Sequence, residues 1–563
     1  MLTLRPRAAR LSMSSGQAVS TGQAPGRLAA VTRRRGVSSP PMVIIIPALL
    51  VAAITLVPIL YLLLRASEAG SGIWHLLWRE RTADVLKNTA VLAAGVSLAA
   101  SVIAVPLAWL TTRADLPGRK IWATIAPLPL VIPSYVGALT VVAALGPRGF
   151  LQSALEGPFG IERLPEIYGF WGAWLTLTLF TYPYVFLSVR AALRGLDPSL
   201  DEAARCLGHG AWRTFFFTTL PQLRPAVIAG ALLAALYTIS DFGVVTLLRY
   251  NAFTREIYVQ YRASFDRTLA AALALVLVSF ALVLLMIESR VRGRAVYHRL
   301  GSGAARRARP VPLGTWRYPA LAFCASVTAL ALGLPLGVLV YWLIRSLRRG
   351  DIPAALLTAA QHSVTVSFAA AVVTTLAALP VAILVVRYRT RLGQWVERIC
   401  YAGYGLPGIV VALSFVFLGA RYLTPLYQTL ALLITAYAVR FLPQAIAAAR
   451  GSLLQVNPRL EEAARNLGRS SFGAIRSVTI PLSGPGIAAG AALVFLTVMK
   501  ELPMTLLLSP TGYKTLATSV WTAAGNGAFG EAAAPALLLV VVSAVPTLLL
   551  ASRGSAETPR GDE

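Results

Sequence analysis

Long apolar stretches constrain this chain more than any other feature of its sequence. A helix needs roughly 20 apolar residues to cross the ~30 Å of hydrocarbon in a bilayer, at about 1.5 Å per residue. Twelve such stretches begin near residues 42, 88, 121, 169, 226, 268, 319, 362, 399, 426, 485 and 532. The sequence therefore predicts an all-α polytopic membrane protein with about twelve transmembrane helices.

The charge balance argues against a soluble protein and against a nucleic-acid-binding protein. Hydrophobic residues make up 56% of the chain and charged residues only 13%, whereas a soluble domain normally has about 25% charged residues. The chain has 51 Lys and Arg against 23 Asp and Glu, which leaves a formal net charge of +28. In a chain with so many apolar stretches, we interpret this excess as a signal of membrane topology.

The positive charges fall mostly on one side of the predicted spans. With the N-terminus inside, the segments on the cytoplasmic side carry most of the Lys and Arg, and the positive-inside rule then predicts that both termini are cytoplasmic. The first apolar stretch is longer than a signal-peptide core and is expected to stay as an anchor. We expect five parts: a disordered cytoplasmic tail (1–41), a first transmembrane half (42–288), a basic cytoplasmic linker (289–318), a second transmembrane half (319–551) and a cytoplasmic C-terminal tail (552–563).

The two halves share a repeated pattern of residues. Pairs 260 residues apart include Glu202 and Glu462, Gly208 and Gly468, and Pro225 and Pro485. Upstream the separation is 274 residues, and it pairs Arg113 with Arg387 and Pro133 with Pro407. Because each half has six predicted spans, both halves enter the membrane in the same sense, and parallel repeats of this kind are typical of transporters.

The strongest repeated segment lies in a predicted cytoplasmic loop of each half. It reads DPSLDEAARCLG from Asp197 and NPRLEEAARNLG from Asn457. Asp and Asn are good helix caps, and the proline that follows each of them suits the first helical position. Gly208 and Gly468 permit the left-handed turn that ends a helix. Each half is therefore predicted to present a short charged helix on a glycine hinge, followed by a second helix that re-enters the membrane.

This pattern resembles the EAA motif of ABC-type importer permeases, in which Glu-Ala-Ala is followed by Gly at a fixed spacing and then by Ile-x-Leu-Pro. Thr218 and Val478 stand where that family prefers Ile, and Ile480 replaces Leu. The resemblance implies the type I permease fold of two parallel six-helix repeats, in which the short helix docks in a groove of the ATP-hydrolysing subunit. It assigns this coupling role to Glu202, Ala203, Ala204, Gly208, Glu462, Ala463, Ala464 and Gly468.

The sequence contains neither GxxxxGKS nor GxxxxGKT, so the chain lacks the usual loop that cradles ATP phosphates. We therefore expect no enzyme activity and no cofactor in this chain, with ATP and Mg bound by a separate ABC ATPase. The resemblance implies an ATPase homodimer at the cytoplasmic face, a periplasmic solute-binding protein and the lipid bilayer as partners, and no nucleic acid. It also implies a multi-pass location in the bacterial inner membrane.

Four charged residues fall inside predicted spans, namely Asp241, Arg440, Lys500 and Glu501. A charge at the bilayer centre costs about 2.5–3.5 kcal/mol on insertion scales, so these side chains should face the bundle interior. Asp241 and Glu501 are repeat equivalents, and Gly243 and Pro503 follow them at positions where they could interrupt the helices. The candidates for the translocation pathway are Asp241, Gly243, Lys500, Glu501 and Pro503. The alternative is that the carboxylates are structural and hold an arginine on a neighbouring helix.

The segments around these acids resemble the fused two-half ferric-iron permeases of the ABC family. They read SDFGVVTLLRYNAFTREIY from Ser240 and KELPMTLLLSPTGYKTLATSVW from Lys500. Met504 and Ser509 depart from the small residue and the Arg of that family. The resemblance covers about residues 45 to 550 and implies ferric iron as the solute. Thiamine, polyamine and phosphonate permeases share the architecture and are the alternatives within the class.

Two other protein classes are weighed against an ABC permease. A secondary transporter of the major facilitator type also has two six-helix halves, and RADLPGRK from Arg113 resembles its basic turn, but RYRTRLGQ from Arg387 lacks the acid. A membrane-embedded enzyme would need a catalytic constellation, and none is found. Cys206, Cys324 and Cys400 are too scattered for a thiolate site, and the four histidines are isolated, so we expect no metal site.

Overall fold

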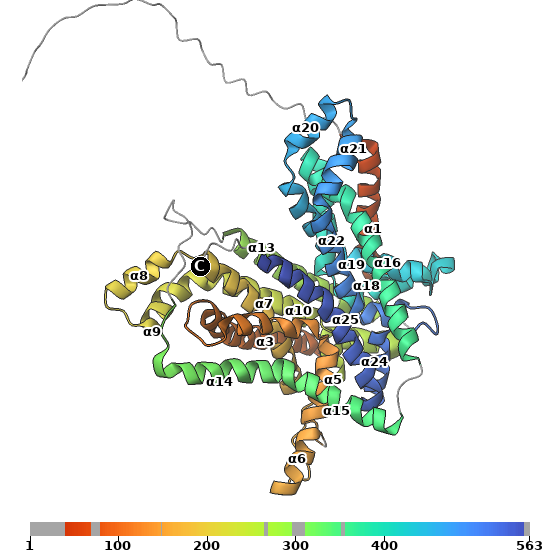
Figure 1. The fold of residues 1–563 in the computed structure, drawn as a ribbon. Coiled ribbons are helices and arrows are strands. Elements are labelled where there is room, and N and C mark those ends of the chain that lie inside the picture. The colour runs from red at the N-terminus through yellow and green to blue at the C-terminus, as the bar shows by residue number, and fades with distance from the viewer. Residues whose placement is uncertain are drawn as a thin grey trace, which may run out of the picture. The chain divides into compact units, whose positions relative to one another are not determined.

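Figure 1 shows a computed structural model, which describes residues 40–68, 79–147, 149–263, 268–294, 310–350 and 355–556. Every regular element in these ranges is a helix, apart from one isolated bridge between Ala114 and Val311. The predicted N-terminal tail lies outside the described residues up to residue 39, and so do residues 295–309 of the linker and 557–563 of the C-terminal tail. The described start of that C-terminal tail belongs to the last helix, α25 (Phe529–Ala556).

Ten helical segments in the described ranges are long and apolar enough to cross a bilayer. Two shorter apolar helices, α18 (Gly408–Arg421) and the first part of α25, stand where two further spans were predicted. The prediction of an all-α polytopic fold is therefore confirmed. The spans themselves are less uniform in length than the apolar stretches suggested.

The third and ninth predicted spans begin later than their apolar stretches. Near residue 121 the chain forms a seven-residue helix and a 3-10 turn before the membrane helix starts at Ser134. Near residue 399 it forms a twelve-residue helix and a 3-10 turn before the membrane helix starts at Gly408. Pro133 and Pro407 lie directly before these starts, and proline cannot continue a preceding helix because it lacks an N–H. The elements are α4 (Arg119–Ile125), η1 (Leu128–Val131) and α5 (Ser134–Leu145), and then α17 (Arg391–Ala402), η6 (Gly403–Gly405) and α18.

Each half is built around three long helices that pack on one another. They are α3 (Glu80–Thr112), α7 (Phe170–Gly195) and α10 (Leu220–Ser240) in the first half, and α16 (Leu356–Ile383), α19 (Leu430–Gln455) and α22 (Ile480–Met499) in the second. Small residues allow the close approach of these helices. A Cβ on Gly230 would lie 2.7 Å from Val185 Cα, and one on the equivalent Gly490 would lie 2.5 Å from Ala448 Cβ.

The first helix of each half packs against the other half. The N-terminal helix α1 (Met42–Glu68) contacts α16, α17 and α18, and Figure 1 shows it beside α16. In return, α14 (Arg317–Thr328) contacts α3, and α15 (Leu334–Arg349) contacts α5. The rings of Tyr61 on α1 and Phe417 on α18 lie 4.8 Å apart. The hydrophobic core of the first half accordingly contains Cys324 and Leu339 from the second.

The remaining helices are short or connect these elements. They are α6 (Phe150–Phe159), α12 (Phe253–Ala263), α13 (Thr268–Arg294), η3 (Gly314–Trp316), η4 (Ala329–Gly333), η5 (Leu384–Tyr388), η7 (Thr424–Leu426) and α24 (Leu516–Gly525).

The exchange of first helices predicts a specific cross-link. In a chain without native cysteines that carries a protease site between residues 295 and 309, Tyr61→Cys with Phe417→Cys should be joined by a short thiol cross-linker. The two fragments should then run as one band after cleavage. The matched control is Tyr61→Cys with Ala143→Cys, because Ala143 on α5 is the repeat equivalent of Phe417. Two separate bands from the Tyr61→Cys, Phe417→Cys chain after cleavage would contradict the packing of α1 on the second half.

Candidate functional site

The two repeated loops fold as short helices with the predicted ends. The helix α8 (Pro198–Cys206) is capped by Asp197, whose Oδ1 accepts a hydrogen bond from Ser199 N at 3.0 Å. The helix α20 (Pro458–Asn466) is capped in the same way by Asn457, which accepts from Arg459 N at 3.0 Å. Gly208 and Gly468 follow with φ of 84° and 85°. The predicted caps and left-handed turns are therefore confirmed.

Each short helix leaves an apolar residue exposed at its end. Leu207 is 79% exposed and Leu467 is 86% exposed. Of the eight residues assigned to coupling, Glu202, Ala203, Gly208, Ala463 and Gly468 are exposed, Glu462 and Ala464 are half-buried, and Ala204 is buried. Both copies therefore leave a leucine uncovered at the same repeat position.

The opposite face of each helix is attached to the bundle through an acid that sequence reasoning missed. Asp201 accepts a hydrogen bond from Thr219 Oγ1 at 3.0 Å, and Glu461 accepts from Thr479 Oγ1 at 2.5 Å. The two threonines lie in η2 (Phe215–Thr219) and η8 (Ile475–Thr479), π-helical turns that follow α9 (Ala211–Thr214) and α21 (Ser471–Ala474). The constant repeat offset pairs both acids and both threonines, and it could have revealed these contacts.

An arginine at the base of each loop binds its backbone. Arg113 Nη2 donates to the carbonyls of Leu193 and Leu196 at 2.9 and 3.2 Å. Burial lowers the pKa of Arg113, and the nearby carboxylate of Asp201 opposes this shift by stabilising the guanidinium.

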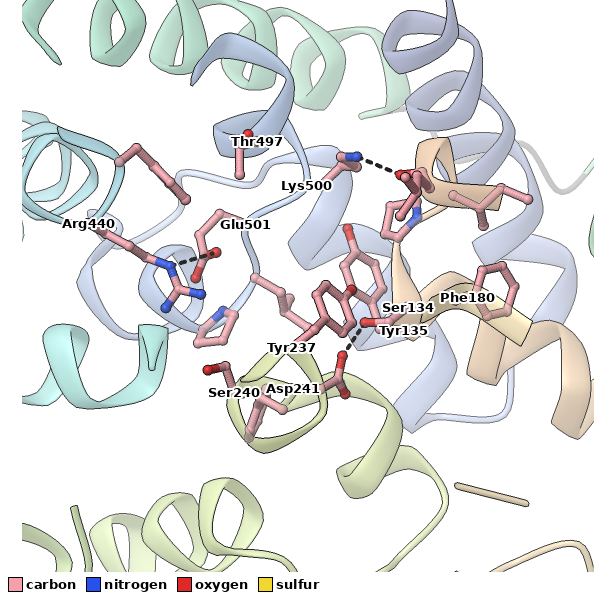
Figure 2. Close-up of a pocket in the computed structure, with 18 of the residues that line it drawn as sticks. Ser134, Tyr135, Phe180, Tyr237, Ser240, Asp241, Arg440, Thr497, Lys500 and Glu501 are labelled. Carbon is pink, nitrogen blue, oxygen red and sulfur yellow. Dashed lines mark hydrogen bonds and ion pairs between the residues drawn. The ribbon is translucent and has the colours of Figure 1, made fainter. Parts of the chain in front are cut away.

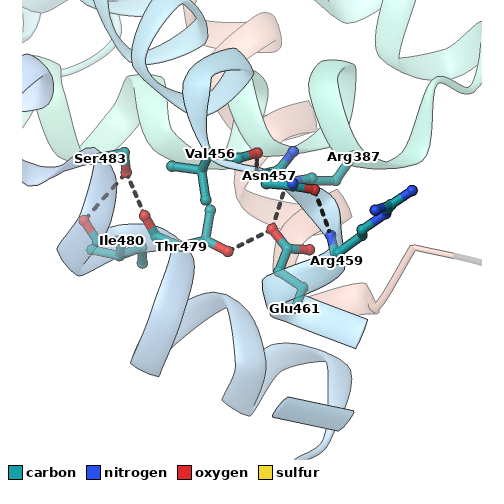
Figure 3. Close-up of polar contacts among 8 residues, drawn as sticks. All are labelled: Arg387, Val456, Asn457, Arg459, Glu461, Thr479, Ile480 and Ser483. Carbon is teal, nitrogen blue, oxygen red and sulfur yellow. Dashed lines mark hydrogen bonds and ion pairs between the residues drawn. The ribbon is translucent and has the colours of Figure 1, made fainter. Parts of the chain in front are cut away.

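The repeat equivalent in the second half makes the corresponding contacts. Arg387 Nη2 donates to Val456 O at 3.3 Å, and its Nε lies 2.6 Å from Glu461 Oε1 (Figure 3). Each loop is thus attached to the bundle through an arginine that lies just after a long helix, α3 in the first half and α16 in the second.

A second pair of repeated features lies where two long helices break. α10 ends at Ser240 and α11 (Gly243–Leu247) begins at Gly243; α22 ends at Met499 and α23 (Pro503–Leu508) begins at Pro503. The predicted interruptions are therefore confirmed. Gly243 also allows α11 to approach α5, because a Cβ there would lie 2.5 Å from Tyr135 Cβ.

The two breaks face one central cavity of about 290 Å³ (Figure 2). All five residues proposed for the pathway line this cavity. The lining consists of Leu130, Ile132, Pro133, Ser134, Tyr135, Phe180, Tyr184, Tyr237, Ser240, Asp241, Phe242 and Gly243 from the first half, and Arg440, Phe441, Gln444, Thr497, Lys500, Glu501, Leu502 and Pro503 from the second.

The equivalent acids in the cavity have different partners. Asp241 accepts hydrogen bonds from Ser134 Oγ and, at 2.8 Å, from Val244 N at the start of α11. Glu501 faces Arg440 instead, with 3.8 Å between Oε2 and Nε. Lys500 donates to Leu130 O at 2.9 Å and not to its neighbour Glu501. Glu501 therefore lines the cavity and also faces an arginine on a neighbouring helix, as the structural alternative expected.

Gly408 makes room for the Arg440–Glu501 pair. It is the repeat equivalent of Ser134, and a Cβ at this position would lie 2.3 Å from Arg440 Nη1 and 2.6 Å from Glu501 Oε1. A serine like that of the first half would therefore collide with the ion pair. The absence of a side chain here allows the second half to replace a hydroxyl–carboxylate contact with a guanidinium–carboxylate contact.

The cavity is chemically asymmetric although its positions are repeated. Phe180, Tyr184 and Tyr237 of the first half correspond to Arg440, Gln444 and Thr497 of the second. Sequence reasoning missed the three aromatic residues, and it recorded Arg440 only as a charge within a span. The separation of 260 residues between repeats pairs Arg440 with Phe180 and Lys500 with Ser240. It would therefore have indicated the first-half wall of the cavity. One wall is therefore aromatic, and the other is polar and charged.

Gly408→Ala should destabilise the protein because the new methyl group displaces Arg440 from Glu501. We expect a loss on the order of 1–3 kcal/mol, which is typical of overpacking, measured as a lower thermal unfolding midpoint in detergent. The matched control is Gly451→Ala in α19, where a Cβ meets nothing within 4 Å. An equal midpoint for the two variants would contradict the close approach described here.

Comparisons with known proteins agree with this architecture. The family model for the binding-protein-dependent transport system inner membrane component matches residues 102–294 and 375–552, once in each half. The Fe(3+)-transport system permease protein FbpB 2 of Haemophilus influenzae is 34% identical over 91% of this chain and 98% of its own length.

Two shorter relatives match only part of the chain. The molybdenum transport system permease protein ModB of Escherichia coli is 32% identical over 31% of this chain and 76% of its own length. The sulfate transport system permease protein CysT of Escherichia coli is 28% identical over 44% of this chain and 92% of its own length. The matches favour the ABC permease over the major facilitator alternative. The chain belongs to the family of binding-protein-dependent transport system inner membrane components.

Proposed function

We propose that this permease carries ferric iron across the bacterial inner membrane in an ATP-driven importer. The observation that carries the choice of solute is the 34% identity to a Fe(3+)-transport permease over nearly the whole of both chains. The chain is a permease subunit, and ATP hydrolysis belongs to a separate subunit. A periplasmic solute-binding protein would deliver the iron to the outer face.

The exposed faces of α8 and α20 are the proposed docks for the ATPase. They carry the same Glu-Ala-Ala-Arg sequence and the same exposed leucine, so they suit two identical subunits. A homodimer of an ABC ATPase at the cytoplasmic face, with ATP and Mg bound between its own residues, satisfies this requirement. The excess of Lys and Arg on the loop side supports this orientation, with both termini in the cytoplasm.

The central cavity is the proposed pathway. The oxygen atoms that could coordinate a cation include the hydroxyls of Tyr135 and Tyr237 and the carboxylates of Asp241 and Glu501. Hard cations favour oxygen ligands. Within the part of the chain that the structure describes, no three or more His, Cys, Asp or Glu side chains gather into a metal-binding group. This composition favours passage of the solute over tight retention.

The proposed cycle couples the docks to the cavity. ATP binding would draw the two ATPase subunits together and with them α8 and α20. The halves would then open outward, and the binding protein would release its solute into the cavity. Hydrolysis would return the inward-open state, because each state makes different contacts with the nucleotide-bound ATPase.

An oxyanion is the second candidate solute. Lys500 and Arg440 both line the cavity, and cationic side chains favour an anion. The relatives named for molybdenum and sulfate transport point the same way, although each covers less than half of this chain. The carboxylates of Asp241 and Glu501 argue for a cation.

Uptake of radiolabelled solutes distinguishes these candidates. Cells that express the chain with an ABC ATPase and a solute-binding protein that co-purify with it should accumulate iron-55 supplied as Fe(III). Labelled molybdate, sulfate, thiamine, spermidine and a phosphonate should not accumulate above the level of cells that lack the chain. Accumulation of one of these solutes and not of iron would overturn the choice of iron as the solute, while the proposed function as an importer permease would stand.

Reversing the charge of the Glu in each Glu-Ala-Ala motif should abolish coupling. Glu202→Arg combined with Glu462→Arg places two cations on the docking faces, and we expect a loss of more than about tenfold in both ATPase co-purification and uptake, as for a disrupted interface hot spot. Glu162→Arg, at an exposed acid outside both loops, is the control and should keep both. Normal assembly of the double variant would exclude these faces as docks.

Neutralising the cavity lysine should impair transport without affecting assembly. Lys500→Gln keeps a donor near Leu130 O but replaces a charge-assisted hydrogen bond between the two halves with a weaker neutral one, and a lost interaction of 1–2 kcal/mol corresponds to a change in uptake of about five- to thirtyfold. The ATPase should co-purify as with the unmodified chain. Gln222→Ala, outside the cavity, is the control, and unchanged uptake by Lys500→Gln would remove Lys500 from the pathway.

A further inference from the structure

The end of the linker between the halves pairs with the chain just after α3. Val311 N donates to Arg113 O at 2.8 Å, and Asp115 N donates to Val311 O at 3.1 Å. The carboxylate of Asp115 then accepts a hydrogen bond from Leu313 N at 2.8 Å. Val311 is 5% exposed and Ala114 is fully buried. We call residues 310–316 the clip.

The residue that the clip binds is also the residue that holds the first loop. The main chain of Arg113 accepts the bond from Val311, while its side chain donates to Leu193 O and Leu196 O at the end of α7. Leu196 directly precedes Asp197, the cap of α8. A continuous set of hydrogen bonds therefore runs from the clip through Arg113 to the start of the first coupling helix.

The far end of the clip contacts the same loop a second time. The ring of Trp316 packs edge-on against Trp212 in α9, with 5.6 Å between the centroids, and Trp212 stacks on Phe216 at 6.3 Å. Trp316 directly precedes α14, the first membrane helix of the second half. The clip thus contacts the first loop directly after α8, at Trp212, and is linked to it before α8 through Arg113.

The second loop is built differently. Arg387 repeats the side-chain contact of Arg113, but the position of Asp115 is taken by Arg389 with a φ of 46°. Thr390 then caps α17 by accepting from Gly393 N at 3.0 Å. The chain turns into a helix at the point where the first half pairs with the clip, so α20 has no clip among the described residues.

We propose that Asp115 and Trp316 are positioning residues for ATPase coupling, which act by fastening the first coupling helix to the first membrane helix of the second half. This inference rests on the proposed docking of the ATPase at α8. Among the residues that the structure describes, the clip makes the two docks unequal, since it ties the first loop to both halves, whereas the ties of α20 given above come from its own half. Movement imposed on α8 is then passed to α14 directly as well as through the bundle.

The test measures how strongly the binding protein stimulates ATP hydrolysis by the complete transporter in proteoliposomes. Asp115→Ala removes the acceptor for Leu313 N, and Trp316→Ala removes the ring that meets Trp212. We expect each to reduce the ratio of stimulated to basal hydrolysis by about fivefold or more, the scale of a typical coupling free energy. Co-purification of the ATPase should stay near the unmodified level.

Conservative variants separate positioning from simple loss of structure. Asp115→Asn keeps an Oδ1 acceptor and Trp316→Phe keeps a ring, so both should restore the ratio. Asp84→Ala, at an exposed aspartate of α3 far along the helix from Arg113, is the control and should leave it unchanged. A purely structural role would lower the amount of transporter and both hydrolysis rates together.

Two results would overturn the inference. One is an unchanged ratio in Asp115→Ala and Trp316→Ala; the other is failure of Asp115→Asn and Trp316→Phe to restore a lowered ratio. Failure of the proposed function gives a different result, because the unmodified chain would then neither retain an ATPase nor show any stimulation by the binding protein.

Discussion

The cost of an unpaired backbone group in hydrocarbon governs this structure. It explains why the spans are helices, and it makes the two breaks after α10 and α22 expensive unless side chains satisfy the exposed groups. Asp241 does so by accepting from Val244 N, while Thr254 Oγ1 donates to the Asp241 carbonyl at 2.6 Å. Thr505 Oγ1 donates to the Glu501 carbonyl at 2.5 Å. Asp241 thus both stabilises a break and lines the cavity, while Thr254 and Thr505 support the breaks from outside the lining.

A few side-chain contacts also hold the two repeated loops. A loop that transmits movement from a partner must be attached firmly to the membrane helices. Each short helix is attached through one arginine and one acid–threonine hydrogen bond. These anchors lie on the inner side, and the exposed leucines lie outward. The loops therefore separate a contact face for a partner from an attachment face for the bundle, and both copies keep that division.

Local patterns in the sequence predicted what depends on neighbouring residues. The caps Asp197 and Asn457, the glycine turns and the helix breaks were predicted because each is set by a few adjacent side chains. The partners of the acids depend on distant segments, so local patterns left the Arg440–Glu501 pair unassigned. The inward-facing Asp201 and the aromatic wall of the cavity could be reached only through the repeat offset. Apolar stretches likewise overlooked Pro133 and Pro407, which delay two spans. The coupling and pathway roles remain predictions.

The exchange of first helices has a consequence for how the chain is made. The core of the first half contains Cys324 of α14, Leu339 of α15 and Leu539 of α25, and α25 is the last helix synthesised. The first half therefore cannot complete its packing while it is being inserted; it must wait in the membrane until nearly the whole chain has left the ribosome. The closing of this core is therefore a late step in biogenesis, and a chain that lacks α25 leaves the first half unfinished.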